Sequence, residues 1–455
     1  MAEKTINFEE ALQVADEAVL ASKGRHLTDV EMTILQGSWQ NQTYQQMSDS
    51  GDYAANYLQR TVGPKLWRLL SEALGEDVSK TNFRMALQRR WRSGQYASQQ
   101  RLRAPTAKTS KLEFTEGPVA LDSPYYVERP PIEERCYGAV LQPGALLRIR
   151  APQQMGKTSL LDRILARSRK SDYQTIALSF DLADSTFFTD LRKFSQWFCA
   201  SIGKQLGLPN KLEEYWDDIF GCNSNSTAYF EEYLLSEISS PLVLALDKVD
   251  VVFEHPAIAN DFCRLLRAWY DIAKRSDRRG AIWKKLHLIV AHSTEVYGAL
   301  DINSSPLANV GIIVPLPEFT LEQVNDLARR HSLDWLGKAE LEQLMVAIGG
   351  HPGLTQKALS YIQRKKTTLE KLLQIAPTEA GPFGDHLREH LGNLQQYPEL
   401  MAAFREVLLA SGAVKIASDM AFKLQGMGLV QLQGNDSRLR CELYRQYFCD
   451  RLKAG

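Results

Sequence analysis

The feature that most constrains the fold is a short stretch in which an apolar run breaks into a loop and then into a helical pattern. The apolar run begins at Leu146, and the loop ends in Gly156-Lys157-Thr158. A strand, a loop and a helix around this tripeptide form the context of a phosphate-binding P-loop, in which backbone N–H groups at the helix N-terminus bind the anion. The stretch therefore predicts an α/β sheet with a phosphate site at the start of a helix.

Each residue type in this loop has a chemical role in the hypothesis. Gly156 would let the backbone approach the phosphates, Lys157 would reach the outer phosphates, and the Thr158 hydroxyl would ligate Mg²⁺. Ser159 follows in the first helical turn, and we include it among the phosphate-binding residues. The full pattern has a glycine at the position of Ala151, and alanine is tolerable there if the turn does not need a positive φ.

A second signal downstream supports the P-loop. Residues 242–247 form a continuous apolar run that ends in Asp247. Such runs are typical of parallel strands buried on both faces, and an acid at the carboxyl end would lie beside the P-loop and hold Mg²⁺ through water. Together the two motifs predict a site for ATP or ADP with Mg²⁺, in which Thr158 and Asp247 are the metal residues.

Residues 1–92 predict a small helical module. Thr28 is placed to cap a helix, with Glu31 at the capping-box position. A further helix is expected at residues 43–48, and another begins near Tyr53 after the polar turn of residues 49–52. Two short helices joined by a tight turn containing glycine are typical of a helix-turn-helix.

Residues 93–122 predict a linker within a basic part of the chain. Between Asp77 and Glu113 there are nine lysines and arginines and no acidic residue. Three interpretations remain open: a solvated tether, a salt-sensitive contact with nucleic acid, or a segment that docks on an acidic face of the same protein. The candidate nucleic-acid residues are Arg60, Lys65, Arg89, Arg90 and Arg92.

The rest of the chain predicts three further parts. Residues 123–317 alternate strands with helices, expected at 187–206 and 262–273, which indicates a doubly wound parallel sheet. Residues 318–395 predict a helical lid. Residues 396–455 show helices followed by a hairpin signal at Gly434-Asn435, and this order predicts a winged helix.

Composition excludes several classes of protein. Lysine plus arginine and aspartate plus glutamate balance at 54 each, so nucleic-acid affinity would need a local patch. The six cysteines are scattered without a Cys-x-x-Cys pair, which argues against a zinc site or a disulfide framework. No apolar stretch reaches the roughly 18 residues of a membrane span, and no signal peptide precedes the first helix. We expect a cytoplasmic protein without membrane contact.

Several motifs resemble known families. Residues 27–31, 63–67 and 79–84 resemble the N-terminal helix-turn-helix module of bacterial STAND-type and AAA-like ATPases, of the effector or vWA-MoxR-associated type. The P-loop, Asp247 and Gly350-His351-Pro352 resemble the STAND or initiator branch of AAA-like ATPases. The resemblance implies an ATP-controlled regulatory switch, whose nucleotide state governs homo-oligomer formation and the presentation of the N-terminal module to a nucleic acid or a protein effector. The alternative is a DNA-engaging ATPase of the transposition-regulator or replication-initiator kind.

The resemblance also assigns catalytic roles. Such ATPases usually follow the strand-end aspartate with a glutamate that polarises the attacking water, whereas this chain has Lys248. A protonated lysine cannot act as that base. Either Asp250 takes over beside Asp247, or the site hydrolyses ATP slowly, and we favour slow hydrolysis. Ser293 or Thr294 would be the polar sensor of the γ-phosphate, a role for which His292 competes.

Two further segments would complete the nucleotide site by the same resemblance. Pro352 corresponds to the proline that lies over the adenine in STAND and initiator ATPases. Residues 125–131, which precede the first strand, would pack near the adenine as well.

Overall fold

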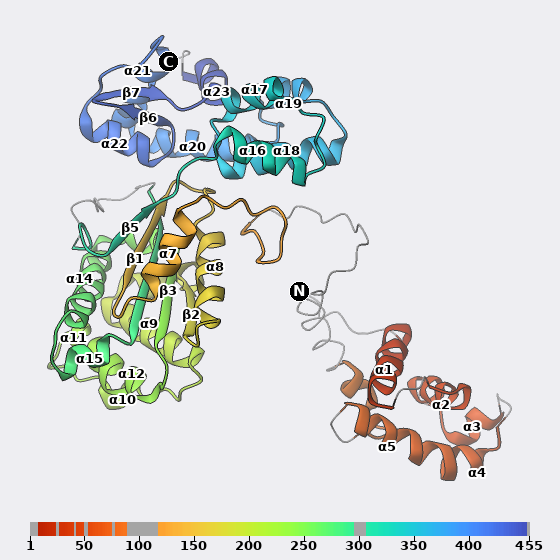
Figure 1. Ribbon diagram of the computed structural model, residues 1–455. Coiled ribbons are helices and arrows are strands. Elements are labelled where there is room, and N and C mark those ends of the chain that lie inside the picture. Colours follow the sequence, from red (N-terminus) through yellow and green to blue (C-terminus); the bar gives the residue numbers. More distant parts are fainter. Residues whose placement is uncertain are drawn as a thin grey trace. The chain divides into compact units, whose positions relative to one another are not determined.

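The computed structural model describes residues 8–23, 27–40, 42–49, 53–74, 78–88, 117–294 and 306–452. The chain divides into two compact units, Met1–Leu112 and Glu113–Gly455 (Figure 1). Within the described ranges, no helix has the length and apolar character needed to cross a membrane.

The N-terminal unit is helical, as predicted. Its core contains Ile34, Leu58, Leu66 and Leu70, which are fully buried. The backbone N–H of Thr28 donates to Glu31 Oε2 at 2.9 Å, as the predicted capping box requires. The elements are α1 (Phe8–Lys23), α2 (Asp29–Trp39), α3 (Tyr44–Asp49), α4 (Ala55–Tyr57), a π-helical segment (Leu58–Val62) and α5 (Gly63–Leu74).

The helix expected near Tyr53 is present. It begins at Ala55 and continues through the π-helical segment into α5. Pro64 has no N–H to donate to the preceding turn, and a wider turn just before it accommodates that loss. Packing favours glycine at position 63, because a Cβ there would lie 2.6 Å from the Tyr44 hydroxyl oxygen.

The second unit contains the predicted parallel α/β sheet. Its strand order is β2-β3-β4-β1-β5, and every pairing is parallel. All residues of β3 and β4 are buried, which matches the continuous apolar runs in the sequence. The strands are β1 (Leu146–Ala151), β2 (Gln174–Ser179), β3 (Leu242–Asp247), β4 (Leu286–Ser293) and β5 (Ile312–Pro315).

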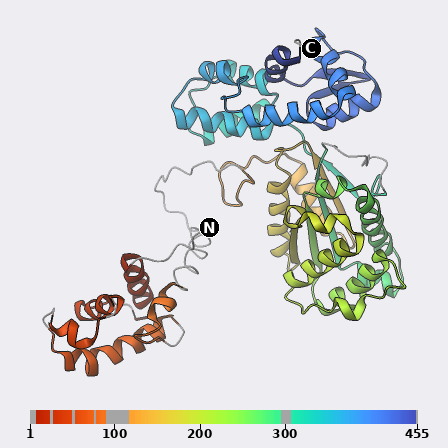
Figure 2. The ribbon, with the colours of Figure 1, turned by 180° about the vertical axis from the view of Figure 1, so that it is seen from behind.

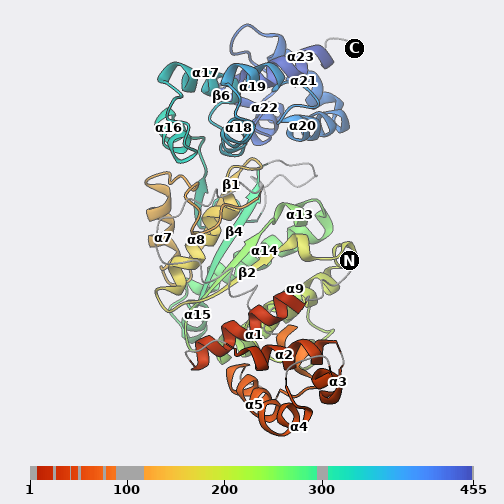
Figure 3. The same cartoon turned by 90° about the vertical axis from the view of Figure 1, so that its right-hand side faces the viewer.

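Helices cover both faces of this sheet, as Figures 2 and 3 show. Because successive strand residues point to opposite faces, Val243 and Ala245 pack with helices α7 and α8, whereas Leu244 and Leu246 pack with α9 and α14. The helices are α7 (Ile132–Val140), α8 (Lys157–Arg169), α9 (Leu191–Gln205), α10 (Leu212–Tyr215), α11 (Cys222–Ala228), α12 (Leu235–Glu237), α13 (Asp250–Phe253), α14 (Pro256–Ala273) and α15 (Arg278–Trp283).

Two predicted helix starts differ from the structure. The helix expected from residue 187 begins at Leu191, because Asp190 Oδ1 accepts the Lys193 N–H at 2.8 Å and caps the helix there. The helix expected from residue 262 already begins at Pro256, a residue that suits a first helical position.

The C-terminal part of the second unit is mainly helical and shares one hydrophobic core, which extends from Phe319 to Leu452. The segment expected to form a helical lid, residues 318–395, begins with two helices that are separated at residues 331–337. The predicted hairpin is present and turns at Gly434, with φ of 63°. The elements are α16 (Leu321–Arg330), α17 (Lys338–Ile348), α18 (Pro352–Lys365), α19 (Leu369–Ile375), α20 (Gly384–Gln396), α21 (Pro398–Leu409), α22 (Ser418–Gly426), β6 (Val430–Gln433), β7 (Asp436–Leu439) and α23 (Glu442–Leu452).

Candidate functional site

The loop between β1 and α8 has the backbone geometry that a P-loop requires. Gly156 has a φ of 90°, and a Cβ at this position would lie 3.3 Å from Arg129 Nη2. Ala151 ends β1 and does not have a positive φ, which explains why alanine is tolerated in place of glycine. The strained residue of the loop is Gln154 instead, with φ of 55°.

Lys157 and Thr158 point back into the loop and toward the sheet. Lys157 Nζ donates to the carbonyl oxygens of Ala151 at 3.0 Å and Pro152 at 2.7 Å. Thr158 Oγ1 donates to Asp247 Oδ2 at 2.8 Å, across 89 residues of sequence. The first turn of α8 and the end of β3 thus bring an ammonium group, a hydroxyl and a carboxylate to one place.

Asp247 is 8% exposed, and this burial raises its pKa. Hydrogen bonds from Thr158 and from the Lys248 N–H, together with the Lys248 charge, oppose the shift. Mg²⁺ prefers oxygen ligands and usually takes only one or two from the protein, with substrate phosphates and water for the rest. The hydroxyl of Thr158 and the carboxylate of Asp247 are oxygen donors at adjoining positions, and they fit such an ion.

The start of α13, just after β3, and the end of β4 are joined by a hydrogen bond. Asp250 Oδ1 accepts the backbone N–H of Ser293 at 2.7 Å. Lys248, in contrast, has an exposed side chain and a left-handed backbone, with φ of 57°. A non-glycine residue in this conformation carries a strain of about 1 kcal/mol or more, and such residues are frequent at functional sites.

The other residues proposed near the sensor position differ in their surroundings. His292 is 2% exposed, and its Nδ1 is 2.8 Å from the carbonyl oxygen of Ser293. Burial lowers its pKa to about 4, so the ring is neutral at neutral pH. Thr294 Oγ1 donates to the carbonyl oxygen of Gly426 at 2.7 Å and thereby contacts the end of α22.

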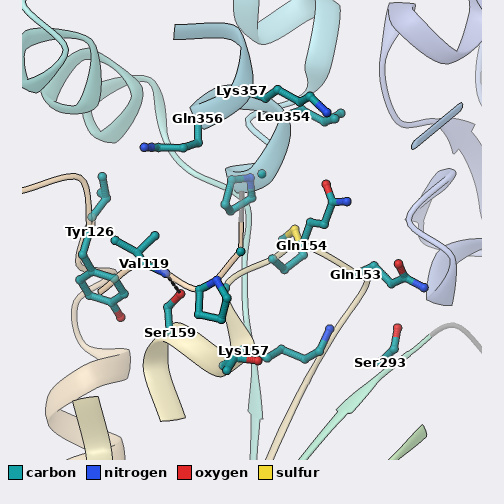
Figure 4. Close-up of a pocket in the computed structure, with 18 of the residues that line it drawn as sticks. Val119, Tyr126, Gln153, Gln154, Lys157, Ser159, Ser293, Leu354, Gln356 and Lys357 are labelled. Carbon is teal, nitrogen blue, oxygen red and sulfur yellow. Dashed lines mark hydrogen bonds between the residues drawn. The ribbon is translucent and has the colours of Figure 1, made fainter. Parts of the chain in front are cut away.

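A cavity of about 440 Å³ brings the predicted residues together (Figure 4). Ala151 is not among the residues that line the cavity, and its carbonyl oxygen accepts hydrogen bonds from Lys157 Nζ and from the Thr294 N–H. Residues of the loop lie on one side of the cavity and residues of α18 on the other. The predicted site residues that line it are Gly156, Lys157, Thr158, Ser159, Asp247, Asp250, Ser293 and Pro352.

The Gly-x-Pro element contacts the P-loop directly. Gly353, which follows Pro352 at the start of α18, donates its N–H to the Gln154 carbonyl oxygen at 3.1 Å. A Cβ at Gly353 would lie 2.7 Å from Gln154 Cβ, so only glycine fits this approach. The element therefore closes the cavity over the loop.

Several residues that line the cavity were not predicted from the sequence. Arg129 is 3% exposed, donates from Nη1 to the Met155 carbonyl oxygen at 2.8 Å, and has no partner at Nε. The segment that contains it was expected near the adenine, but no pattern singled out the arginine. Gln356 and Lys357 also line the cavity. Their positions four and five residues after Pro352 place them one helical turn along α18, which is the signal that could have found them.

The candidate nucleic-acid residues are only partly described. Arg60 and Lys65 are exposed on the helix that runs from α4 to α5. Arg68 on the same helix pairs with Glu72 at 3.2 Å. The remaining candidates, Arg89, Arg90 and Arg92, lie outside the described residues.

Each of the two units matches a known protein family. Residues 6–90 match the family described as the vWA-MoxR associated protein N-terminal helix-turn-helix. Residues 114–450 match the family described as an AAA-like domain. A search of curated proteins by sequence found no significant match.

Solved structures with a similar fold include a Walker-type ATPase. A Walker-type ATPase of Pyrococcus abyssi matches with a TM-score of 0.51 at 14% identity, over 71% of this chain and 96% of the other. Cdc6p from Pyrobaculum aerophilum gives 0.38 at 15%, over 74% and 97% of the two chains. AMPPCP-bound DnaA from Aquifex aeolicus gives 0.31 at 13%, over 67% and 79%.

The family match covers well over half of the chain, and it includes the P-loop, the acid-bearing strand and the Gly-x-Pro element. The parallel sheet and the P-loop geometry agree with it. The chain therefore belongs to the AAA-like domain family and has the fold of a P-loop ATPase, preceded by a helix-turn-helix module.

Proposed function

We propose that this protein is an ATP-binding regulatory switch of the STAND type that hydrolyses ATP slowly. The observation that carries the proposal is the grouping of Lys157, Thr158 and Asp247 around one cavity, with Lys248 in the position of the usual glutamate. In this proposal the nucleotide state controls self-association and the presentation of the helix-turn-helix module.

The loop residues would bind the nucleotide as follows. Lys157 would exchange its two carbonyl partners for phosphate oxygens, which accept stronger, charge-assisted hydrogen bonds. Thr158 and Asp247 would hold Mg²⁺, which would neutralise charge on the phosphates. Pro352 would cover the base from α18, and the buried guanidinium of Arg129 would hold the back of the loop through Met155.

Slow hydrolysis follows from what surrounds the phosphate end of the cavity. Lys248 offers a positive charge where a base is needed. One carboxylate oxygen of Asp250 already accepts from the Ser293 N–H, which favours a positioning role for Asp250 over a role as the base. A site of this kind binds ATP for long periods and suits a switch better than a motor.

The C-terminal helices and hairpin would report the nucleotide state as a winged helix. Support comes from two contacts with the nucleotide-binding part. Thr294, next to the proposed sensor Ser293, donates to Gly426 of α22. A Cβ at Gly428 would lie 3.2 Å from Pro152 Cβ of the P-loop, so this backbone lies close to the loop.

The test of the function is nucleotide binding by the full chain. We expect Mg-ATP to bind, and Lys157→Ala to weaken the affinity at least about a hundredfold, because the lysine would make charge-assisted hydrogen bonds of about 1.5–3 kcal/mol each. Lys170→Ala is a matched control, since Lys170 is exposed just after the end of α8. Equal ATP affinity in the two variants, measured by calorimetry on folded protein, would refute the proposal.

A second candidate function is DNA engagement of the replication-initiator or transposition-regulator kind. The exposed Arg60 and Lys65 on the N-terminal unit favour it, together with the basic sequence that follows. Phosphate contacts give salt-dependent binding with little sequence preference. Replacing Arg89, Arg90 and Arg92 with glutamine should reduce the log–log salt slope by roughly two to three units if all three meet phosphates. Tight, salt-insensitive binding to a single sequence would argue against this mechanism.

A further inference from the structure

A short segment before the first helix of the second unit packs against the P-loop helix. Residues Gly117–Ala120, here called the strap, lie near the end of the predicted linker of residues 93–122. The backbone N–H of Val119 donates to Ser159 Oγ at 2.9 Å, a bond drawn in Figure 4. Gly117, Pro118 and Val119 line the same cavity as the P-loop. The strap is thus a wall of the candidate nucleotide site.

Arg163, one helical turn after Ser159 on α8, also binds the strap. Its Nη1 donates to the Val119 carbonyl oxygen at 3.0 Å, and its Nη2 donates to that of Ala120 at 2.9 Å. Nη1 also donates to the Ser159 carbonyl oxygen at 3.0 Å. Two successive carbonyls of the strap are therefore bound by one guanidinium group.

The guanidinium is itself fixed by an aromatic ring of the cavity wall. The central carbon of Arg163 lies 3.4 Å from the centroid of the Tyr126 ring, within the range of a cation–π interaction. Tyr126 is oriented in turn, because its hydroxyl donates to Glu133 Oε1 at 2.8 Å. The strap, Arg163 and Tyr126 form one continuous set of contacts along the edge of the cavity.

The Ser159 hydroxyl connects this set to the phosphate position. A hydroxyl can donate one hydrogen bond while it accepts others. Since Ser159 Oγ accepts from Val119, its own hydrogen remains able to donate to a ligand oxygen. Ser159 lies in the first turn of α8, where backbone N–H groups favour an anion. A phosphate there would polarise the hydroxyl and strengthen the Val119 bond, because linked hydrogen bonds are cooperative.

We propose that Arg163 is a positioning residue for nucleotide binding and that the strap is stabilised when a nucleoside phosphate occupies the cavity. This inference rests on the proposed function, and it adds a residue outside the P-loop through which the ligand acts on the chain. The strap lies at the start of the AAA-like match, which begins at residue 114, and after the helix-turn-helix module and its basic segment in sequence. Nucleotide binding would therefore hold in place the segment through which the helix-turn-helix module and the basic residues join the second unit.

The experiment is hydrogen exchange followed by mass spectrometry on the full chain, with no nucleotide, with Mg-ADP and with the non-hydrolysable analogue Mg-AMPPCP. We expect either nucleotide to slow exchange in peptides that contain Val119 and Ala120 by about tenfold, the factor that corresponds to 1.4 kcal/mol. Arg163→Gln should abolish this protection and weaken nucleotide affinity by about tenfold. Arg167→Gln is the matched control, an exposed arginine one turn further along α8.

The possible outcomes distinguish failure of this inference from failure of the proposed function. If the unmodified chain binds neither nucleotide, the proposed function and the inference both fail. If it binds them while exchange in the strap is unchanged or faster, the inference alone fails. The same holds if Arg163→Gln and Arg167→Gln bind nucleotide equally well. The unmodified chain provides the exchange test by itself, so the inference stays refutable even if Arg163→Gln unfolds.

Discussion

The replacement of Lys248 by glutamate tests the most unusual feature of the candidate site. Lys248 directly follows Asp247, its side chain is exposed, and it lines the cavity. A glutamate there would supply a carboxylate able to orient water and accept its proton. General bases contribute about 10²–10⁴-fold to such reactions. We expect the lower end, about a hundredfold faster phosphate release, which is about 2.7 kcal/mol of barrier.

The structure also predicts how this variant should depend on pH. The Lys248 charge helps to lower the pKa of Asp247, against the burial that raises it. Replacing a cation with an anion removes that help, so the pKa of Asp247 should rise further. Protonated Asp247 could no longer hold Mg²⁺. Activity of Lys248→Glu should therefore fall, on the acid side, at a higher pH than activity of the unmodified chain.

The assay is steady-state phosphate release with saturating Mg-ATP, compared with Lys248→Gln. Glutamine matches glutamate in length and shares the strain of the left-handed backbone, so the pair isolates the carboxylate. If both variants release phosphate at the same rate, the missing base is not what limits hydrolysis. Fast turnover by the unmodified chain, lost in Asp250→Asn, would instead identify Asp250 as the base.

Three further predictions follow from the second unit and from the proposed switch. Gly353→Ala should weaken nucleotide affinity, because the added Cβ would overlap Gln154. Gly392→Ala is the control, since a Cβ there would have no neighbour within 4 Å, and calorimetry should show unchanged affinity for it. Burial lowers the pKa of His386 to about 4, so the unfolded state binds a proton first as pH falls. That contribution to stability is complete above about pH 6.5 and is lost toward pH 4, which thermal unfolding at pH 7 and pH 5 should detect as a lower midpoint at pH 5. Mg-ATP or Mg-AMPPCP should increase the mass seen by light scattering at micromolar protein, and one monomeric mass throughout would contradict the switch.

Short-range patterns in the sequence predicted the elements that build the candidate site. The strand at 242–247 and the helix after Gly156 follow from apolar runs and from the residues that end them. The loop itself was predicted because phosphate binding restricts which residues can occupy it. The hairpin at Gly434 was predicted because a tight turn needs a residue that tolerates positive φ. In each case the physical cause acts within a few residues of chain.

The errors arose where packing overrode the local signal. The helix expected near Tyr53 was predicted, but its continuation into α5 through a π-helical segment was not. Residues 331–337 interrupt a stretch that reads as helical by apolar spacing alone. Spacing shows which face is buried, but it does not show where a neighbouring element needs the chain to turn.

The sequence by itself determined that this chain has a P-loop, an acid-bearing buried strand and helices on both faces of a parallel sheet, since periodicity and loop chemistry encode them locally. Only the tertiary structure decided that Asp250 accepts from Ser293, that Arg163 holds Val119, and that Gln356 and Lys357 line the cavity. The partners in these contacts come from separate elements: Asp250 and Ser293 are 43 residues apart in the chain, and Val119 and Arg163 are 44 residues apart. Their side chains meet because the sheet and α18 pack around one cavity, and a linear pattern does not specify that packing.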